Sequence, residues 1–390
     1  MQGDALHKNG KFAIYVLGAG FSAAAGVPMA AELWREILKR GLLIGGRGGK
    51  FREDLDAYLE YRRLCDGMEL TYEAIDLEEL MGFLDIEHHL GLRGKDTWSS
   101  DGNEGQMVIK SLIGQILSER TPAAGAVPDL YVDFARRLQP NDIVLTFNYD
   151  VLLERALDQA GVPYRLFPYR FKELHAYGGT LDDSRHEVIV LKVHGSVDWF
   201  DDRRYLHLRD AFARQGADPD QAHDPVFGKG CPWTLAALVD GPRHNDDPLQ
   251  HLFLLKEIEA FYEDPPMFTI APSLISPSTQ KLVYSSYVRD FWTGMGDAGW
   301  ANFRLVVIGY SLPQHDDYAR QILYRVARNY QGAGGDLGEA LKIDRDPLLL
   351  VDRRTDAAGV DEIKRRYAFV DWSKADLYAD GFDASVVSRL

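Results

Sequence analysis

Short, continuous apolar runs alternate along the chain with longer amphipathic segments. Five runs predict buried β-strands, at residues 12–17, 143–147, 188–193, 303–308 and 347–351. A shorter run at 368–370 predicts a sixth strand. Because each run is apolar at nearly every position, both faces of its strand should be covered. Such strands, separated by helices, predict an α/β fold with a Rossmann-like parallel sheet and helices on both faces.

Apolar residues at helical spacing predict α-helices in the segments between these strands. The predicted helices are 29–43, 53–92, 107–117, 130–138, 151–161, 281–300 and 317–330, with a glycine-rich loop at 41–49. Two stretches do not fit the alternation of strand and helix: a helical insertion at about 53–138, and a polar insertion at about 201–266 that is rich in Asp, His and Pro. We therefore expect one domain over residues 1–390 that carries two insertions.

Glycine and polar residues follow the predicted strands directly. They are Gly18-Ala19-Gly20, Asn148-Tyr149-Asp150, His194-Gly195-Ser196, Gly309-Tyr310-Ser311 and Asp352. In open parallel sheets, ligands bind beyond the carboxyl ends of the strands. We therefore expect these five segments to converge on one crevice.

The composition narrows the range of partners. The 390 residues carry 44 Lys and Arg against 59 Asp and Glu, a net charge of −15. Direct nucleic-acid binding is not expected, because it needs clustered cations, whereas backbone amides can still bind an anionic small ligand. The two cysteines, Cys65 and Cys231, cannot supply the four thiolates of a four-cysteine structural zinc site. With no apolar run near 18 residues and no signal-peptide pattern, we expect a cytoplasmic protein without membrane spans or metal.

The first predicted strand leads into a glycine-rich turn, Gly18-Ala19-Gly20-Phe21-Ser22. Glycines let the backbone approach a pyrophosphate, and the helix start that follows favours its negative charge. The alternative interpretation is a tight turn without a ligand. The spacing is not G-x-G-x-x-G, because the next glycine is Gly26, and no acidic residue ends a second strand about 20 residues later. Both departures argue against an ordinary dehydrogenase.

Two further strand ends carry side chains suited to chemistry. The amide of Asn148 can donate and accept hydrogen bonds with ribose hydroxyls or a water, and the imidazole of His194 can take a proton near pH 7. Each has a structural alternative. Asn148 or Asp150 can cap the next helix, the preferred interpretation for Asp150, and a histidine after a strand can be a satisfied structural group. Asp316 and Asp317 are predicted to begin a helix, where acidic residues complement the dipole.

Taken together, these segments resemble the sirtuin family. The family's series is a G-A-G-x-S turn followed by Gly and Pro, a T-x-N-x-D segment, an H-G-S segment and a late G-x-S turn. Here it reads Gly18 to Ser22 with Gly26 and Pro28, Thr146 to Asp150, His194 to Ser196, and Gly309 to Ser311. The resemblance implies NAD as the substrate, with Asn148 orienting the nicotinamide ribose or the attacking water and His194 acting as the general base.

The resemblance also implies which residues bind NAD. They are Gly18, Ala19, Gly20, Phe21, Ser22, Pro28, Asp150, Gly309, Ser311 and Asp352. Gly20, Ser22 and Ser311 would hold the pyrophosphate. Asp352 occupies the position where the family contacts the adenosine end, with a different residue type.

The chain departs from sirtuin deacylases, which carry a four-cysteine zinc ribbon and a recognisable acyl-lysine tunnel motif. Segments 76–80, 147–150 and 274–277 look instead like the bacterial sirtuin-like branch that hydrolyses NAD in antiphage defence. Within this branch, the chain most resembles the stand-alone subunit that pairs with a HerA-type ATPase translocase. The resemblance therefore implies an NAD glycohydrolase that releases nicotinamide and ADP-ribose.

Three other functions stay open. The chain could be an NAD-dependent protein deacylase, which the missing zinc cysteines disfavour, or a non-catalytic NAD or ADP-ribose sensor, which would have no need of a base at His194. A nuclease subunit is disfavoured by the acidic balance and by the lack of a D/E-x-K metal cluster near a strand. We also expect a homo-oligomer, in which the helices at 72–92 and 107–138 present an apolar face to a second copy.

Overall fold

The computed structural model describes residues 12–44, 47–93, 102–175, 178–242, 247, 249–264, 270–275, 291, 295, 299–314, 316–332 and 344–390. At its centre lies a seven-stranded sheet in the order β12-β11-β10-β1-β2-β6-β3, in which every strand pair is parallel. The strands are β1 Ala13–Leu17, β2 Ile143–Thr146, β3 Tyr164–Arg165, β6 Val188–Lys192, β10 Arg304–Ile308, β11 Leu348–Val351 and β12 Ala375–Tyr378. The predicted α/β fold with a parallel sheet is confirmed.

Five of these strands coincide with the predicted apolar runs, but the sixth predicted strand is wrong. Residues 368–370 lie in a turn after α15 (Ala357–Arg366), and Val370 is apolar because it packs into the core. β3 and β12, which the pattern missed, are the two edge strands and are only partly buried. An edge strand has incomplete cover, so its sequence shows no continuous apolar run.

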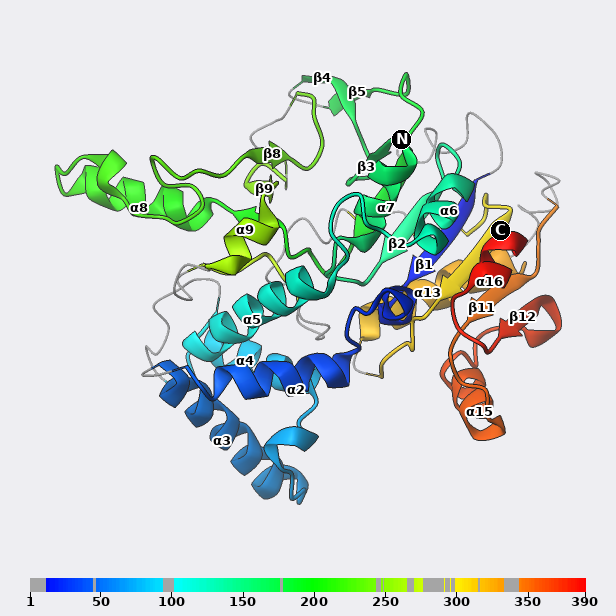
Figure 1. Cartoon of the computed structure of the whole chain (residues 1–390), viewed down its shortest axis with the longest axis horizontal. Coiled ribbons are helices and arrows are strands. Elements are labelled where there is room, and N and C mark those ends of the chain that lie inside the picture. The colour runs from blue at the N-terminus through cyan, green and yellow to red at the C-terminus, as the bar shows by residue number, and fades with distance from the viewer. Residues whose placement is uncertain are drawn as a thin grey trace.

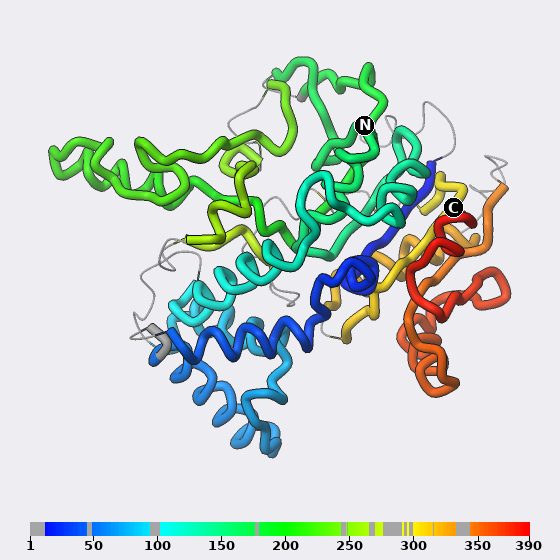
Figure 2. Tube along the Cα trace, viewed as in Figure 1, coloured from blue at the N-terminus to red at the C-terminus, as the bar shows by residue number. Residues whose placement is uncertain are grey.

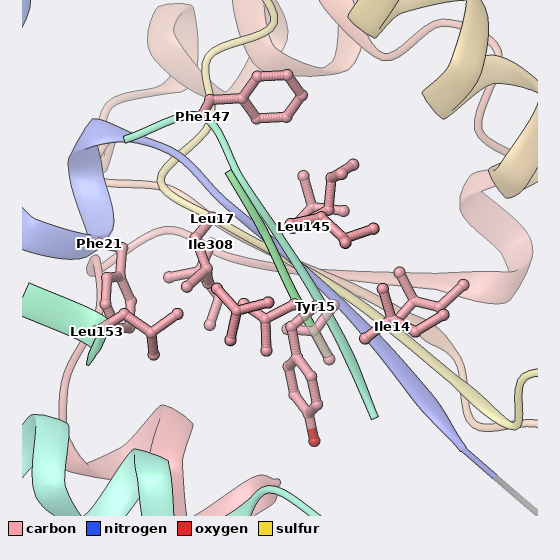
Figure 3. Packing of buried hydrophobic residues seen from close by; sticks show 14 of the residues in the cluster. Ile14, Tyr15, Leu17, Phe21, Leu145, Phe147, Leu153 and Ile308 are labelled. Atoms are coloured by element: carbon pink, nitrogen blue, oxygen red, sulfur yellow. The ribbon is translucent and has the colours of Figure 1, made fainter. Parts of the chain in front are cut away.

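β1 lies in the middle of the sheet and is buried along its whole length. Val16 pairs with Leu145 of β2 on one side and with Val307 of β10 on the other, although β10 lies far along the chain (Figure 2). Figure 3 shows Tyr15 and Leu153 on one face of the sheet and Ile14 on the other. Packing on both faces explains why the run is apolar at every position.

Helix α6 (Asp129–Arg137) packs against both α7 (Leu152–Ala160) and α16 (Ala384–Arg389). Figure 1 shows them lying over the sheet. The edge-to-face contact of Tyr15 with Phe134 of α6 joins this layer to β1. Leu323 of α13 (Asp317–Tyr330) belongs to the same core cluster.

A second core cluster lies within the helical segment that precedes β2. Its helices are α2 (Ala30–Gly41), α3 (Arg47–Asp66), α4 (Leu77–Leu90) and α5 (Glu104–Arg120), joined by α9 (Ile258–Glu263). The stretch predicted as helical at 53–92 contains two helices, because the chain leaves the first at Asp66 and begins the second at Leu77 after an Asp76 cap. α3 also begins inside the predicted loop 41–49, whereas α6 packs with the sheet.

The polar stretch 201–266 contains regular structure. β8 (Leu235–Ala237) and β7 (Trp199–Asp201) flank β9 (Leu252–Leu255) in a small antiparallel sheet, and α8 (Arg203–Arg214) projects from it in Figure 1. The predicted helix 281–300 and residues 276–277 fall largely outside the described residues. None of the described helices is long and apolar enough to cross a membrane.

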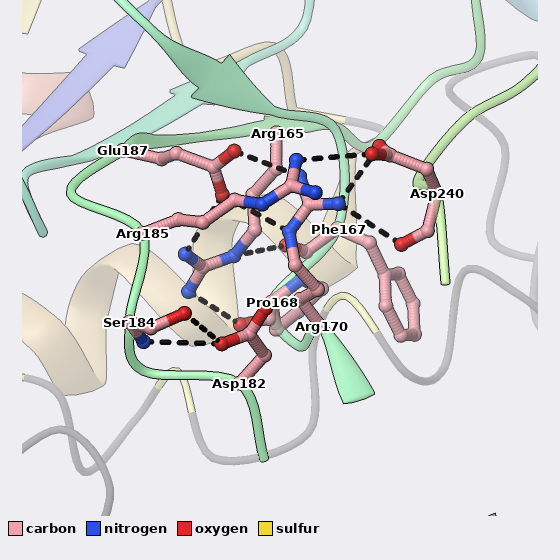
Figure 4. Close-up of polar contacts among 9 residues, drawn as sticks. All are labelled: Arg165, Phe167, Pro168, Arg170, Asp182, Ser184, Arg185, Glu187 and Asp240. Carbon is pink, nitrogen blue, oxygen red and sulfur yellow. Dashed lines mark hydrogen bonds and ion pairs between the residues drawn. The ribbon is translucent and has the colours of Figure 1, made fainter. Parts of the chain in front are cut away.

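An arginine network attaches this region to the central sheet (Figure 4). Arg170 contacts Glu187 at 2.7 Å, next to β6, and Asp240 at 2.7 Å, close to β8. Arg185 reaches the other oxygen of Asp240 at 3.0 Å. The hydrogen bond from Arg170 lowers the pKa of Asp240 to about 2, so this carboxylate stays charged at neutral pH.

Candidate active site

The sheet changes direction at β1. The chain adds β2, β3 and β6 on one side of β1, and then returns to add β10, β11 and β12 on the other. In such sheets the loops leaving the central strands diverge to opposite faces and open a crevice between them. The site is therefore expected at the carboxyl ends of β1 and its neighbours.

A cavity of about 650 Å³ lies at this point. All five predicted strand-end segments contribute to its lining: Ala19 and Gly20, Asn148 to Asp150, His194, Gly309 to Ser311, and Asp352. The predicted convergence is confirmed. Pro28 also lines the cavity.

The glycine turn after β1 packs directly against the turn after β10. A Cβ on Gly18 would lie 2.6 Å from the Gly309 carbonyl oxygen, and one on Gly20 would lie 2.7 Å from Gly309 Cα. The N–H of Gly20 donates to the Gly309 carbonyl at 2.9 Å, and that of Phe21 donates to the Gly18 carbonyl at 2.9 Å. These glycines therefore join two strand ends, while the backbone of Ala19 and Gly20 faces the cavity.

Phe21 itself belongs to the core. Its side chain is 1% exposed and packs edge-on against Tyr131 and Phe134 of α6. Gly18, Phe21 and Ser22 do not appear among the residues that line the cavity. These three residues therefore support the conformation of the glycine turn without facing the cavity.

Asn148 ties the end of β2 to the glycine turn. Its Nδ2 donates to the Gly18 carbonyl at 3.0 Å and to Ser22 Oγ at 3.1 Å. Ser22 in turn hydrogen-bonds the Asp150 carboxyl, and Asp150 Oδ1 accepts the N–H of Leu152 at 3.0 Å, at the start of α7. The N-cap residue of α7 is Val151, so Asp150 accepts the first helical N–H from the position before the cap, whereas the Asn148 amide bonds the glycine turn instead. Both Asn148 N–H groups are used, so Oδ1 is the atom suited to contact a ligand.

A buried lysine of β6, Lys192, contacts the turn after β2 and the helix α7 that follows it. Lys192 is fully buried, its ammonium lies 2.8 Å from Glu154 Oε1, and it donates to the Asp150 carbonyl. Burial raises the pKa of Asp150 and of Asp198, and the positive charge of Lys192 opposes that rise. Because a buried ammonium needs partners, Lys192 fixes the turn after β2 and does not line the cavity.

His194 follows the end of β6 and lies in a nearly closed environment. The residue is 5% exposed, and its ring meets Phe147 edge-on with centroids 5.0 Å apart. Its Nε2 lies 3.3 Å from Oδ2 of Asp316, which is 1% exposed and also lines the cavity. Asp316 caps α13 as predicted, because Oδ1 accepts the Ala319 N–H. Its pairing with His194 is a feature that the sequence pattern did not indicate.

The opposite end of the cavity is charged. Asp352 follows β11, is 9% exposed and lies 3.5 Å from Arg354 Nε. Burial raises the pKa of Asp352, and the Arg354 charge opposes that rise. Arg353 and Asp380 complete this end. A carboxylate in this position can accept hydrogen bonds from ribose hydroxyls.

The helical segment supplies a wall that sequence reasoning missed. Leu33 of α2, Glu78 of α4 and Leu117 of α5 all line the cavity. Each reads in the sequence as an ordinary position on an amphipathic helix, so only the docking of α2 to α5 beside the strand ends reveals its role.

Among the residues that the structure describes, no group of His, Cys, Asp and Glu side chains could hold a metal ion. The cysteines within that part of the chain, Cys65 on α3 and Cys231 after α8, are free thiols. The cavity lining includes the imidazole of His194, the amide of Asn148 and the carboxyls of Asp316 and Asp352.

Fold and site together define a class, an α/β protein with a Rossmann-like parallel sheet and a nucleotide-sized cavity at its switch point. Within that class, residues 142–288 match a protein-family model described as a SIR2-like domain. This match includes the Asn148 and His194 segments. No curated protein matches the chain.

Several solved Sir2 structures are similar to the chain at low identity. One is a triply substituted Sir2 homologue in complex with 2′-O-acetyl ADP ribose, at 12% identity and a TM-score of 0.36, covering 100% of this chain and 94% of that one. Another, reported for the mechanism and regulation of Sir2 enzymes, has 14% identity and a TM-score of 0.36, covering 97% and 90%. Sir2Tm bound to a propionylated peptide has 11% identity and a TM-score of 0.32, covering 97% and 91%.

Proposed function

We propose that the protein is an NAD hydrolase that cleaves NAD into nicotinamide and ADP-ribose. One observation carries the proposal: Asn148 and His194 meet the glycine turn in a single cavity at the switch point of the sheet. The match of residues 142–288 to a SIR2-like domain supports it, because the sirtuin family uses NAD.

The cavity offers suitable surroundings for each part of NAD. Its volume falls within the roughly 300–1,000 Å³ of small-ligand sites. Asp352 would accept hydrogen bonds from the adenosine ribose, and the backbone of Ala19 and Gly20, with Ser311, would contact the pyrophosphate. The nicotinamide ribose would then lie toward Asn148 and His194.

The reaction needs few protein groups. The bond between ribose C1′ and the nicotinamide nitrogen breaks, and nicotinamide leaves as a neutral molecule with the bonding electron pair, so no strong acid is required. The sugar develops oxocarbenium character, as in other glycoside cleavages. Water then forms the new bond to C1′, and His194 takes the proton that this water loses. Asn148 Oδ1 would orient the ribose or that water.

The biological setting is part of the proposal. By its resemblance to the bacterial defence branch, the protein would deplete cytoplasmic NAD during phage infection, as a homo-oligomer and together with a HerA-type ATPase. The net charge of −15 supports contact with nucleic acid through that partner and not through this chain.

The direct test is purified chain with NAD, alone and with a HerA-type ATPase, following nicotinamide and ADP-ribose by chromatography. His194→Ala should lower turnover by roughly 10²–10⁴-fold, the usual contribution of a general base. His207→Ala is the matched control, because His207 is exposed on α8. Turnover by the His194 variant equal to that of the control would remove His194 from the reaction.

The same assay separates the alternatives. A deacylase would release nicotinamide only when an acyl-lysine peptide is added, and the acyl group would appear on ADP-ribose. A sensor would bind NAD in a calorimeter without forming product. Release of nicotinamide and free ADP-ribose without any peptide is the outcome that the proposal requires.

A further inference from the structure

Asp316 is held in place by three contacts from different parts of the chain. Its Oδ1 accepts the N–H of Ala319 at 3.4 Å, which caps α13. Its Oδ2 accepts the hydroxyl of Tyr310 at 2.9 Å and lies 3.3 Å from Nε2 of His194. Capping α13 therefore needs one carboxyl oxygen, and the second is directed to the site.

These contacts form a closed cycle of four side chains, of which the imidazole of His194 is one. Tyr310, which donates to Asp316, stacks on Phe147 with centroids 4.0 Å apart and planes within 6°. Phe147 in turn meets the edge of His194 at 5.0 Å. This cycle of contacts joins the ends of β2, β6 and β10 to the start of α13. With Asp316 and His194 only 1% and 5% exposed, little water screens the pair.

We propose that Asp316 is a positioning residue, which fixes the orientation and the tautomer of His194 for the proton transfer described above. This inference rests on the proposed NAD hydrolysis. A carboxylate only accepts hydrogen bonds, so the ring nitrogen facing Asp316 carries a proton and the second nitrogen is the basic one. When that nitrogen takes the proton of the attacking water, the carboxylate stabilises the imidazolium that forms.

Other ionisable groups near the imidazole come from four segments. Tyr149 follows β2, with its ring centroid 6.1 Å from that of His194, and Tyr310 follows β10. Glu78 of α4 lines the same cavity. Asp150 and Lys192 are both buried at the turn after β2, where the backbone carbonyl of Asp150 accepts a hydrogen bond from Lys192. The carboxylate of Asp316 lies in ion-pair contact with the imidazole. Its charge should therefore hold the pKa of His194 above the value found when Asp316 is neutralised.

Asp316→Asn is the informative substitution. Asn caps a helix as well as Asp does, so the start of α13 should survive. The amide nitrogen that replaces Oδ2 would donate to His194 and reverse its tautomer. We expect kcat for NAD to fall by roughly 10²-fold or more with little change in KM, and the acid limb of the pH–rate profile to move to lower pH. Asp317→Asn, its exposed neighbour in α13, should behave as wild type.

A second measurement does not depend on turnover. NMR of the chain labelled at its 11 histidines, with the His194 signal identified by its loss in His194→Gln, gives the pKa of this imidazole directly. It should be at least about one unit lower in Asp316→Asn than in wild type and unchanged in Asp317→Asn.

The outcomes separate the two proposals. An unchanged His194 titration in Asp316→Asn would overturn the positioning role, whether or not kcat falls, because a purely structural loss leaves the titration alone. Wild-type kcat in Asp316→Asn would overturn it as well. If the wild type releases no nicotinamide under any condition, NAD hydrolysis fails instead, and the titration still decides whether Asp316 controls the imidazole.

Discussion

Buried polar side chains decide the geometry of the strand ends, one residue at a time. Asn148 is the clearest case, because its amide reaches across from β2 to the turn after β1. A residue that bonds another loop with both of its N–H groups holds that loop in place, in addition to anything it does for a ligand. Substitutions of Asn148 should therefore change both ligand binding and the free energy of unfolding.

Asn148→Ala should lower the free energy of unfolding by about 1–3 kcal/mol, because the Gly18 carbonyl and Ser22 lose a buried donor. It should also weaken NAD binding and slow nicotinamide release, because the glycine turn loses its anchor. Asn302→Ala is the control. Asn302 is fully buried and donates to the Arg304 carbonyl at the amino end of β10, away from the cavity. Urea unfolding, NAD binding isotherms and nicotinamide-release rates of both variants test the three expected effects. If Asn302→Ala slowed turnover as much as Asn148→Ala, the prediction would be contradicted.

Asp142 links stability to pH. It is 2% exposed and accepts the N–H groups of Ala13 at 2.7 Å and Gln139 at 2.8 Å, and burial raises its pKa to about 6. An unfolded Asp titrates near 3.9. Between about pH 4 and 6 the folded chain therefore binds a proton that the unfolded chain does not, so the free energy of unfolding falls as pH rises through this window.

Asp142→Asn removes that titration, so the fall between about pH 4 and 6 should become shallower, by at most about 1.4 kcal/mol per pH unit. Outside the window the two curves should run parallel. Asp133→Asn, exposed on α6, should leave the slope unchanged. Urea unfolding at half-unit pH steps measures the free energy of unfolding against pH. Identical slopes for wild type and Asp142→Asn between about pH 4 and 6 would refute the raised pKa of Asp142.

At the scale of elements, the turn after β6 is constrained most tightly. Gly195 has φ of 81°, and a Cβ there would lie 1.9 Å from the Ser273 carbonyl oxygen. The neighbouring backbone is paired as well, since the N–H of Ile275 donates to the His194 carbonyl at 2.9 Å. The position of His194 therefore depends on a crossing of two backbones that leaves no room for a side chain.

Gly195→Ala should cost about 2–4 kcal/mol, because a left-handed conformation and a backbone clash act together. Gly26→Ala separates the two effects. Gly26 has φ of 88° with no atom within 4 Å of the added Cβ, so it should cost only about 1–2 kcal/mol. Denaturant midpoints at equal m-values test the difference. Equal losses would mean that the segment at Ser273 moves aside freely.

The elements also explain what the sequence could and could not predict. β1, β2 and β6 were predictable because full burial leaves a continuous apolar run, and the strand ends followed from the rule for parallel sheets. Asp316 was predicted only as a helix start, because its other contact, His194, lies on a distant strand. Likewise Leu33, Glu78 and Leu117 enter the cavity through long-range docking, which local periodicity does not encode.

At the scale of the whole molecule, two helices of the second core carry large exposed apolar side chains. Tyr61 and Leu64 on α3 are 44% and 64% exposed, and Leu90 at the end of α4 is 64% exposed. α5, in contrast, is largely buried within the chain. Exposed apolar side chains can be buried by a second copy of the chain, so we expect any self-association to involve α3 and α4.

We predict that the chain self-associates and that Leu64→Lys with Leu90→Lys shifts it toward a particle of 43.9 kDa, the mass of one chain. Light scattering at micromolar concentration measures the change. Tyr324→Lys, at a 49% exposed position on α13, is the matched control and should leave the oligomer intact. A wild-type particle of one chain mass, or a double variant that associates like wild type, would contradict the prediction.

The central position of β1 has a consequence for synthesis on the ribosome. β1 is made first, but one of its two neighbours, β10, begins only at Arg304, and the cavity also takes residues from Asp352 to Phe382. A nascent chain that has reached residue 300 holds β1, β2 and β6, yet it lacks the strand against which Gly18 and Gly20 close. Until β10 arrives, an apolar edge of β1 stays unpaired and open to wrong partners. The chain thus emerges with His194 already translated and the cavity incomplete, because residues from Asp352 to Phe382 are synthesised much later.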